Sequence, residues 1–140
     1  SEEAFLVLGD MGEVGAAGPQ MHQEVGSYAA QRGVTGLWTL GLLTHWAHTA
    51  YIESAAVSEA QGQGQGQAQG KGQGQEQAQG QGKGRHYGPD DMLLLQTDLA
   101  EVITQRLQAG ITMHVLVKGS RFMKMERVVH FLEKEFNHVD

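Results

Sequence analysis

The chain has 140 residues, a formal net charge of −6 and no cysteine. This length allows one domain with a hydrophobic core, and the lack of cysteine excludes disulfides and thiolate metal sites. The acidic charge argues against nucleic acid or an anionic membrane surface as a partner, and no apolar run approaches the ~20 residues of a membrane span.

The first part of the chain alternates between strand and helix patterns. Residues 4–8 are apolar throughout, as in a strand that is buried on both faces. Pro19 in a first turn then predicts a helix that ends at Gly33. Residues 37–40 predict a second strand, and apolar residues at helical spacing after Gly41 predict a second helix.

Residues 61–84 have a different composition. They contain ten Gln, nine Gly, two Lys, two Ala and one Glu. Such a tract cannot bury enough apolar area to offset the ~1–2 kcal/mol per residue that ordering the backbone costs. We predict a disordered, solvated insertion within a single domain that is formed by residues 1–60 and 85–140.

Two interpretations of the region after the tract stay open. In the first, residues 92–95 form the third strand, and Thr97 or Asp98 caps the helix that follows. In the second, one helix runs over residues 90–109, and the third strand lies at residues 86–87.

The end of the chain repeats the alternation of strand and helix. Gly110 ends the preceding helix, residues 113–117 predict a fourth strand, and residues 125–136 predict the last helix. Alternating strands and helices with short turns imply an α/β fold, with a Rossmann-like, doubly wound, mainly parallel sheet and flanking helices.

A basic turn, Lys118-Gly119-Ser120-Arg121, follows the fourth strand and is expected to open the last helix. The carboxyl ends of parallel strands meet at one edge of the sheet, where α/β proteins bind ligands. Two cations, a hydroxyl and free backbone N–H groups at that edge favour a carboxylate or a phosphate. Gly119 allows the backbone to approach such a ligand closely.

Asp10 follows the first strand and should lie at the same edge of the sheet. It either orients an amine or pairs with a cation of the basic turn, or it is a turn residue that is bonded to its own backbone.

His45 and His48 lie three residues apart on a predicted helix, but no further ligand stands nearby in sequence, so we predict no metal site. Neither a Walker A motif nor a Gly-x-Gly-x-x-Gly fingerprint is present.

Three segments form an ordered set of motifs: Gly9-Asp-Met-Gly-Glu-Val-Gly15, His22-Gln-Glu-Val-Gly26 and Val115-Leu-Val-Lys-Gly-Ser-Arg121, with Met-Glu following. Together they resemble the C-terminal domain of the Mur ligases, of the type that adds D-alanyl-D-alanine to UDP-N-acetylmuramoyl-tripeptide. The family shows the same motifs in the same order, usually with Leu where this chain has Val14. The resemblance covers about residues 4–52 and 92–133.

The resemblance implies an ATP-dependent, ADP-forming ligase of peptidoglycan synthesis in the bacterial cytoplasm. Its partners would be D-alanyl-D-alanine and UDP-N-acetylmuramoyl-tripeptide. ATP and magnesium would be bound mainly by domains that this chain lacks, so no catalytic residue is expected here and the isolated chain should be inactive. The residues implied in substrate binding are Lys118, Gly119, Ser120, Arg121, Asp10 and His22. The family pattern suggests that His22 faces the cleft from the first helix, and a plain position on the helix surface is the alternative.

Other classes of function stay open. The chain fits a non-catalytic, Rossmann-like module that binds a small anion or a protein, and it also fits a truncated gene product that merely folds. The chain begins directly on a strand, so we expect a piece of a longer protein, and we expect it to be a monomer.

Overall fold

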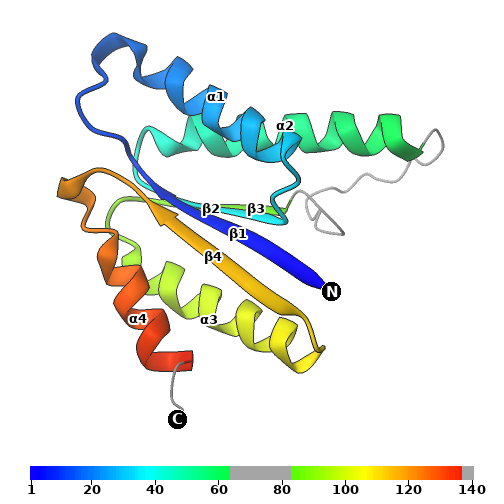
Figure 1. Ribbon diagram of the computed structural model, residues 1–140. Coiled ribbons are helices and arrows are strands. Elements are labelled where there is room, and N and C mark those ends of the chain that lie inside the picture. The colour runs from blue at the N-terminus through cyan, green and yellow to red at the C-terminus, as the bar shows by residue number, and fades with distance from the viewer. Residues whose placement is uncertain (64–82, 137–140) are drawn as a thin grey trace.

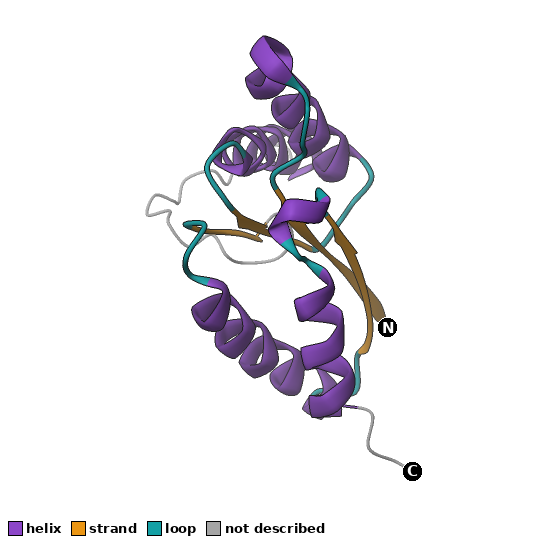
Figure 2. Cartoon of the chain, turned by 90° about the vertical axis from the view of Figure 1, so that its left-hand side faces the viewer, coloured by secondary structure: helices purple, strands orange, loops and turns teal. Residues whose placement is uncertain are grey.

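The computed structural model describes residues 1–63 and 83–136, except for the side chains of residues 59–63. Its four strands form one parallel sheet in the order β3-β2-β1-β4, and helices cover both faces of this sheet (Figures 1 and 2). The predicted α/β, Rossmann-like fold is therefore confirmed. The strands are β1 (Glu2–Gly9), β2 (Gly36–Leu40), β3 (Lys83–Tyr87) and β4 (Thr112–Lys118). The helices are η1 (Gly15–Ala17), α1 (Gly18–Gln31), α2 (Thr44–Gln63), α3 (Met92–Gln108), η4 (Arg121–Met123) and α4 (Glu126–Phe136).

The ends of α1 follow the local signals in its sequence. Pro19 lies in its first turn, where the missing N–H costs no helical hydrogen bond. Gly33 follows the helix with a positive φ of 79°, which glycine adopts without a steric penalty. The N–H groups of Gly33 and Val34 donate to the carbonyls of Ala30 and Ala29 at 3.1 and 3.0 Å. The chain thereby leaves α1 and enters β2.

The third strand follows the second of the two interpretations, and the prediction of a strand at residues 92–95 is wrong. Met92 and Leu95 are buried, whereas Leu93 and Leu94 between them are 74% and 53% exposed. This spacing belongs to one face of a helix rather than to a fully buried strand. The apolar run is the first turn of α3.

The Gln/Gly-rich tract meets ordered elements at both ends. Helix α2 continues to Gln63, three residues into the tract predicted at 61–84, and β3 begins at Lys83. Residues 64–82, where the insertion was predicted, lie outside the described residues. Among the helices that the structure describes, none combines the length and the apolar character that crossing a bilayer requires.

The sheet separates two hydrophobic clusters. On the face of α1 and α2 the buried residues come from alternate positions of the central strands, as the two-residue period of a strand requires, and the other positions of those strands face α3 and α4. The first cluster contains Leu8, Ala29, Leu37, Ala47 and Tyr51. The second, larger cluster includes Phe5, Val7, Trp38, Leu40, Leu95, Leu99, Met123, Met125 and Val128.

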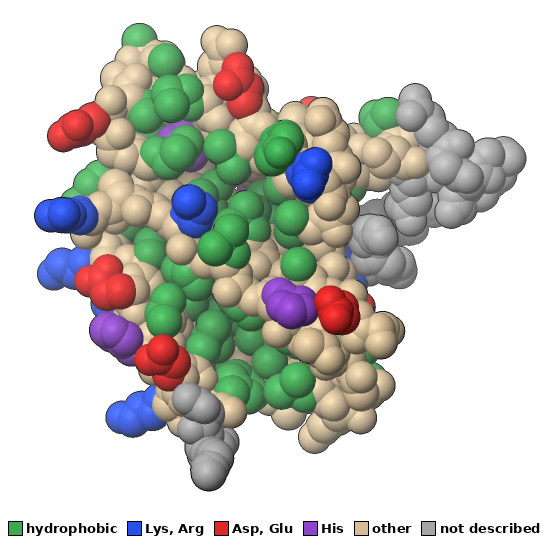
Figure 3. All heavy atoms as spheres, viewed as in Figure 1, with side chains coloured by type: hydrophobic (Ala, Val, Ile, Leu, Met, Phe, Trp, Pro, Cys, Tyr) green, Lys and Arg blue, Asp and Glu red, His purple; other side chains and the backbone are tan. Residues whose placement is uncertain are grey.

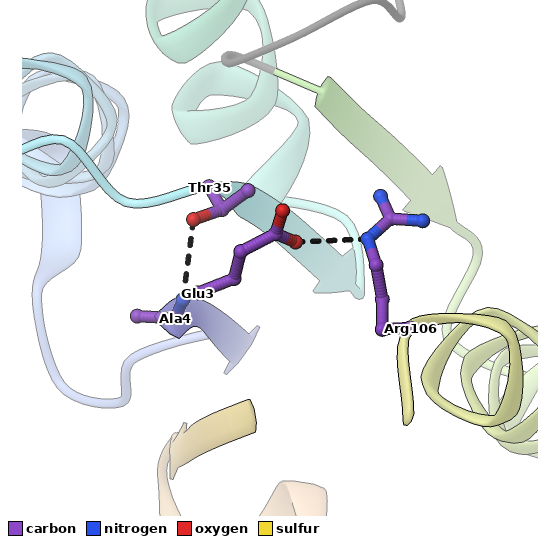
Figure 4. A network of polar contacts seen from close by, with 4 residues as sticks. All are labelled: Glu3, Ala4, Thr35 and Arg106. Carbon is purple, nitrogen blue, oxygen red and sulfur yellow. Dashed lines mark hydrogen bonds and ion pairs between the residues drawn. The ribbon is translucent and has the colours of Figure 1, made fainter. Parts of the chain in front are cut away.

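Polar contacts hold the amino ends of the strands (Figure 4). The Ala4 N–H in β1 donates to Thr35 Oγ1 at 3.1 Å, just before β2. Arg106 Nε, near the end of α3, donates to Glu3 Oε1 at 2.8 Å. These contacts tie the start of β1 to the turn before β2 and to the end of α3.

Candidate functional site

The turns after β1 and β4 lie side by side at the carboxyl edge of the sheet. In the parallel pairing of these strands Leu8 lies opposite Lys118. Two residues further along, the Ser120 N–H donates to the carbonyl of Asp10 at 3.0 Å. The predicted convergence of Asp10 and the basic turn on one edge is confirmed.

The carboxylate of Asp10 binds the beginning of α2. Its Oδ2 accepts from the Leu42 N–H at 2.9 Å and its Oδ1 accepts from the Thr44 N–H at 2.8 Å. Gly41 has a φ of 138°, and a Cβ at this position would collide with the carboxylate. Asp10 therefore satisfies free N–H groups at a helix N-terminus. Among the described residues the carboxylate neither pairs with a cation of the basic turn nor bonds to the backbone of its own turn. Its role in orienting an amine stays a prediction.

His22 is fully buried. Its Nδ1 lies 2.7 Å from the Gly18 carbonyl, and the Met11 N–H donates to its Nε2 at 3.1 Å. Because a carbonyl only accepts, the ring proton lies on Nδ1 and Nε2 is the acceptor. His22 thus faces neither a cleft nor the helix surface. It ties the turn after β1 to α1, so it can affect a bound ligand only by holding Met11 and that turn in place.

Ser120 carries a hydroxyl without a partner. Its Oγ is buried, and no described group forms a hydrogen bond with it. It lies against Gly12, where an added Cβ would come within 3.2 Å of the Ser120 Cβ. Buried polar atoms in proteins are usually paired, so this hydroxyl at the junction of the two turns is a candidate ligand contact.

The two cations of the basic turn are not used within the described residues. Lys118 and Arg121 are both exposed. Among the described residues, Arg106 forms an ion pair with Glu3, and His114 contacts Glu2, so neither cation of the basic turn is paired. An ammonium and a guanidinium are therefore available at the same edge as the Ser120 hydroxyl. This combination suits a carboxylate or a phosphate.

The expectation that the basic turn opens the last helix is wrong. The turn leads only into η4, and α4 begins at Glu126. Lys124 between them has a positive φ of 51°, and the Arg127 guanidinium donates to the carbonyls of Met123 and Lys124 at 2.9 and 3.0 Å. This side chain stabilises the break, so the dipole of α4 does not act at the basic turn.

Gly119 serves packing. A Cβ there would lie 2.6 Å from Met125 Cγ and 3.2 Å from the Gly9 Cα, and a Cβ at Gly9 would lie 2.6 Å from Met125 Sδ. The two glycines make room for the buried Met125 side chain between the ends of β1 and β4. The close approach of a ligand that was expected at Gly119 stays a prediction.

Three histidines, His45, His48 and His86, form a cluster near Asp10. The ring centroid of His86 lies 6.4 Å from that of His45 and 5.9 Å from that of His48, and Thr39 Oγ1 lies 2.7 Å from His86 Nδ1. Burial is the main cause that lowers the pKa values of His48 and His86, and the neighbouring histidines lower them further. At His86 the Asp10 charge and a backbone hydrogen bond oppose the shift.

This cluster could not be predicted while the position of the third strand stayed open. Once β3 is placed, the two-residue period of strands puts Thr39 and His86 on one face. Within residues 1–63 and 83–136, no three side chains of His, Asp or Glu are arranged to hold a metal ion.

Comparison with known proteins gives a fold. No family model and no curated protein matches the chain. A crystal structure of MurF from Acinetobacter baumannii is similar to the chain at a TM-score of 0.60 and 18% identity, covering 96% of this chain and 23% of that one. The chain has a Mur ligase C-terminal-like fold. A second MurF crystal structure from the same organism gives 0.54 at 20% identity, with 93% and 21% covered. The chain spans less than a quarter of either MurF chain.

Proposed function

We propose that the chain is the acceptor-binding portion of an ATP-dependent, ADP-forming ligase of peptidoglycan synthesis. The reaction would add D-alanyl-D-alanine to UDP-N-acetylmuramoyl-tripeptide in the bacterial cytoplasm. The similarity of the fold to MurF crystal structures supports a role in a ligase of this family. The substrate class rests on the edge where the turns after β1 and β4 meet.

One observation carries the proposal. At this edge Lys118 and Arg121 are exposed without an ion-pair partner among the described residues, and the buried Ser120 Oγ between the turns has no hydrogen-bond partner there. A dipeptide carboxylate needs one or two cations and a donor for its remaining lone pairs. Lys118, Ser120 and Arg121 supply these groups.

In the proposed reaction, these residues hold and orient the dipeptide so that its amine meets the activated carboxyl group of the tripeptide. Positioning of this kind accounts for a large part of catalysis when two substrates are joined. None of the described residues is assigned to proton transfer or to nucleophilic attack. The isolated chain is therefore expected to bind the dipeptide weakly and to ligate nothing.

We assign none of the described residues to the binding of ATP or magnesium. The sequence has no Walker A motif, and Asp10, the buried carboxylate at this edge, already accepts from two backbone N–H groups of the α2 start. Magnesium prefers carboxylates and phosphates that can complete an octahedral shell. We assign nucleotide and metal binding to other parts of a longer protein.

An NMR titration of the chain with D-alanyl-D-alanine tests the proposal. We expect backbone amide shifts concentrated at residues 118–121 and at the neighbouring Gly12. Replacement Lys118→Met should weaken binding by about tenfold or more, because a hydrogen bond to a charged group contributes ~1.5–3 kcal/mol. Lys134→Met, which removes an exposed cation of α4, is the matched control and should bind as the unmodified chain does.

Two further ligands separate the proposal from its rival, a module that binds small anions. D-alanyl-D-alaninol lacks the carboxylate and should not shift residues 118–121. Inorganic phosphate should bind more weakly than the dipeptide. If phosphate binds as tightly as the dipeptide, or if L-alanyl-L-alanine does, the acceptor assignment fails and a general anion site is the better description.

A further inference from the structure

The Phe122 side chain lies beside the Ser120 hydroxyl at the junction of the two turns. A Cβ added to Gly12 would lie 3.8 Å from Ser120 Oγ and 3.5 Å from Phe122 Cε2, so the hydroxyl and the ring border the same point. The ring is 66% exposed, whereas the hydroxyl is buried. In Figure 3, Lys and Arg side chains gather at the left-hand rim of the molecule, where Figure 1 places the turn after β4. An apolar ring thus lies next to the groups that are proposed to hold a carboxylate.

The backbone around Phe122 is held in place on both sides. The Met123 N–H donates to the Ser120 carbonyl at 3.1 Å, and the Lys124 N–H donates to the Arg121 carbonyl at 3.0 Å. The Met123 side chain is buried in the larger hydrophobic cluster. Because the Phe122 ring is mostly exposed, its side-chain torsion angles can change without displacing the core, as exposed side chains do within nanoseconds.

The neighbours of Phe122 set it apart from other exposed apolar side chains, which are common on protein surfaces and need no function. It lies between exposed cations and beside a buried hydroxyl that has no partner among the described residues. On the side of β1, the hydroxyl is bordered by Gly12 and by the hydrogen bond from the Ser120 N–H to the Asp10 carbonyl. These are backbone groups of two paired turns, whereas the Phe122 ring can move. A ligand that reaches the hydroxyl therefore contacts this ring.

We propose that Phe122 determines the specificity of the acceptor site, by turning to admit the dipeptide and then packing against the side chain of its C-terminal residue. This inference rests on the proposed function. The methyl group of the C-terminal alanine is attached to the carbon next to the carboxylate, so it lies close to the groups that hold the carboxylate. With the carboxylate at Lys118 and Ser120, the methyl group is within reach of the ring. The site should favour a dipeptide that ends in a residue with a small apolar side chain over one that ends in glycine.

Paired NMR titrations with D-alanyl-D-alanine and D-alanyl-glycine test this inference. The unmodified chain should bind D-alanyl-D-alanine about fourfold more tightly, because burial of one methyl group contributes ~0.8 kcal/mol. In Phe122→Ala the ratio of the two dissociation constants should fall to about one, whereas Phe122→Leu keeps an apolar side chain and should retain a preference. Leu94→Ala removes an exposed apolar side chain of α3. It is the matched control and should keep the full ratio.

Saturation-transfer NMR detects the contact from the side of the ligand. Irradiation of the aromatic protons of the chain should reach the methyl group of the C-terminal alanine more strongly than that of the N-terminal alanine. Phe122→Ala should remove this difference. Because the ring is mostly exposed, the variant should fold as the unmodified chain does, and its amide spectrum checks this.

Two results would overturn this inference and leave the proposed function intact. Both require that D-alanyl-D-alanine still shifts residues 118–121. In the first, the unmodified chain binds D-alanyl-glycine as tightly as D-alanyl-D-alanine. In the second, Phe122→Ala keeps the full ratio. If D-alanyl-D-alanine does not shift residues 118–121 of the unmodified chain, the proposed function fails and this inference fails with it.

Discussion

The turns after β1 and β4 lie at the same edge of the sheet and both carry polar residues, but these residues have different partners. After β1, Asp10 and His22 are buried and bonded to backbone groups of their own chain. After β4, Lys118 and Arg121 are exposed, and the Ser120 hydroxyl has no partner among the described residues. The difference arises because β1 is a central strand, whereas β4 is an edge strand. A polar residue at a strand end is thus a candidate ligand group only where the fold leaves it unused.

The largest expected effect on stability is in the turn after β1, where Asp10 is buried. Asp10→Ala should lower the free energy of unfolding by about 2–4 kcal/mol, because the N–H groups of Leu42 and Thr44 lose their acceptor. Urea denaturation measures this change. Asp90→Ala, in the exposed turn before α3, is the control and should change stability by less than about 0.5 kcal/mol. Equal losses in both variants would contradict the structural role of Asp10.

The next effect tests the one structural position in the basic turn. Gly119→Ala should cost about 1–3 kcal/mol, because the new methyl group meets the buried Met125 side chain. The cost should be smaller in a Met125→Ala background, where the space is free. A double-mutant cycle from denaturation data gives this coupling. Additive effects would mean that Gly119 does not serve the packing of Met125.

A smaller effect concerns pH and the histidines beside Asp10. Folding lowers the pKa values of His48 and His86, so between their folded and unfolded pKa values the unfolded chain binds more protons. The stability that they contribute is present above the unfolded value of about 6.5 and is lost as the pH falls through the folded values. Unfolding free energies from pH 7.5 to 5 should fall more steeply for the unmodified chain than for the double variant His48→Gln/His86→Gln. Identical slopes would refute the coupling.

The smallest effect on stability is expected in the turn after β4, at Ser120. Ser120→Ala should change the free energy of unfolding by less than about 0.5 kcal/mol, since its hydroxyl has no hydrogen bond to lose. Thr39→Val removes a hydroxyl that is bonded next to His86 and should cost about 1 kcal/mol. If Ser120→Ala is as destabilising as Thr39→Val, the serine hydroxyl has a structural partner and is not held free for a ligand.

Much of the fold could be predicted from local patterns. The apolar run at residues 4–8, the Pro19 and Gly33 signals and the last strand all correspond to observed elements. The third strand was ambiguous, because four apolar residues in a row suit either a buried strand or a helix start. Only the burial of one face of α3, with Met92 and Leu95 inside and Leu93 and Leu94 exposed, separates these possibilities.

The candidate site was predicted in part. What could be predicted depends on the order of the strands, and what could not depends on contacts between residues far apart in the sequence. By itself the sequence determined that the turns after the first and last strands share an edge, because all strands of a parallel sheet point the same way. The break before α4 is held locally, by Arg127 and the carbonyls three and four residues before it. Tertiary structure alone decided that Asp10 binds the start of α2 and that β4 lies at the rim of the described sheet. The Asp10 carboxylate meets N–H groups that lie 32 and 34 residues further along the chain, and no spacing in the sequence encodes that approach.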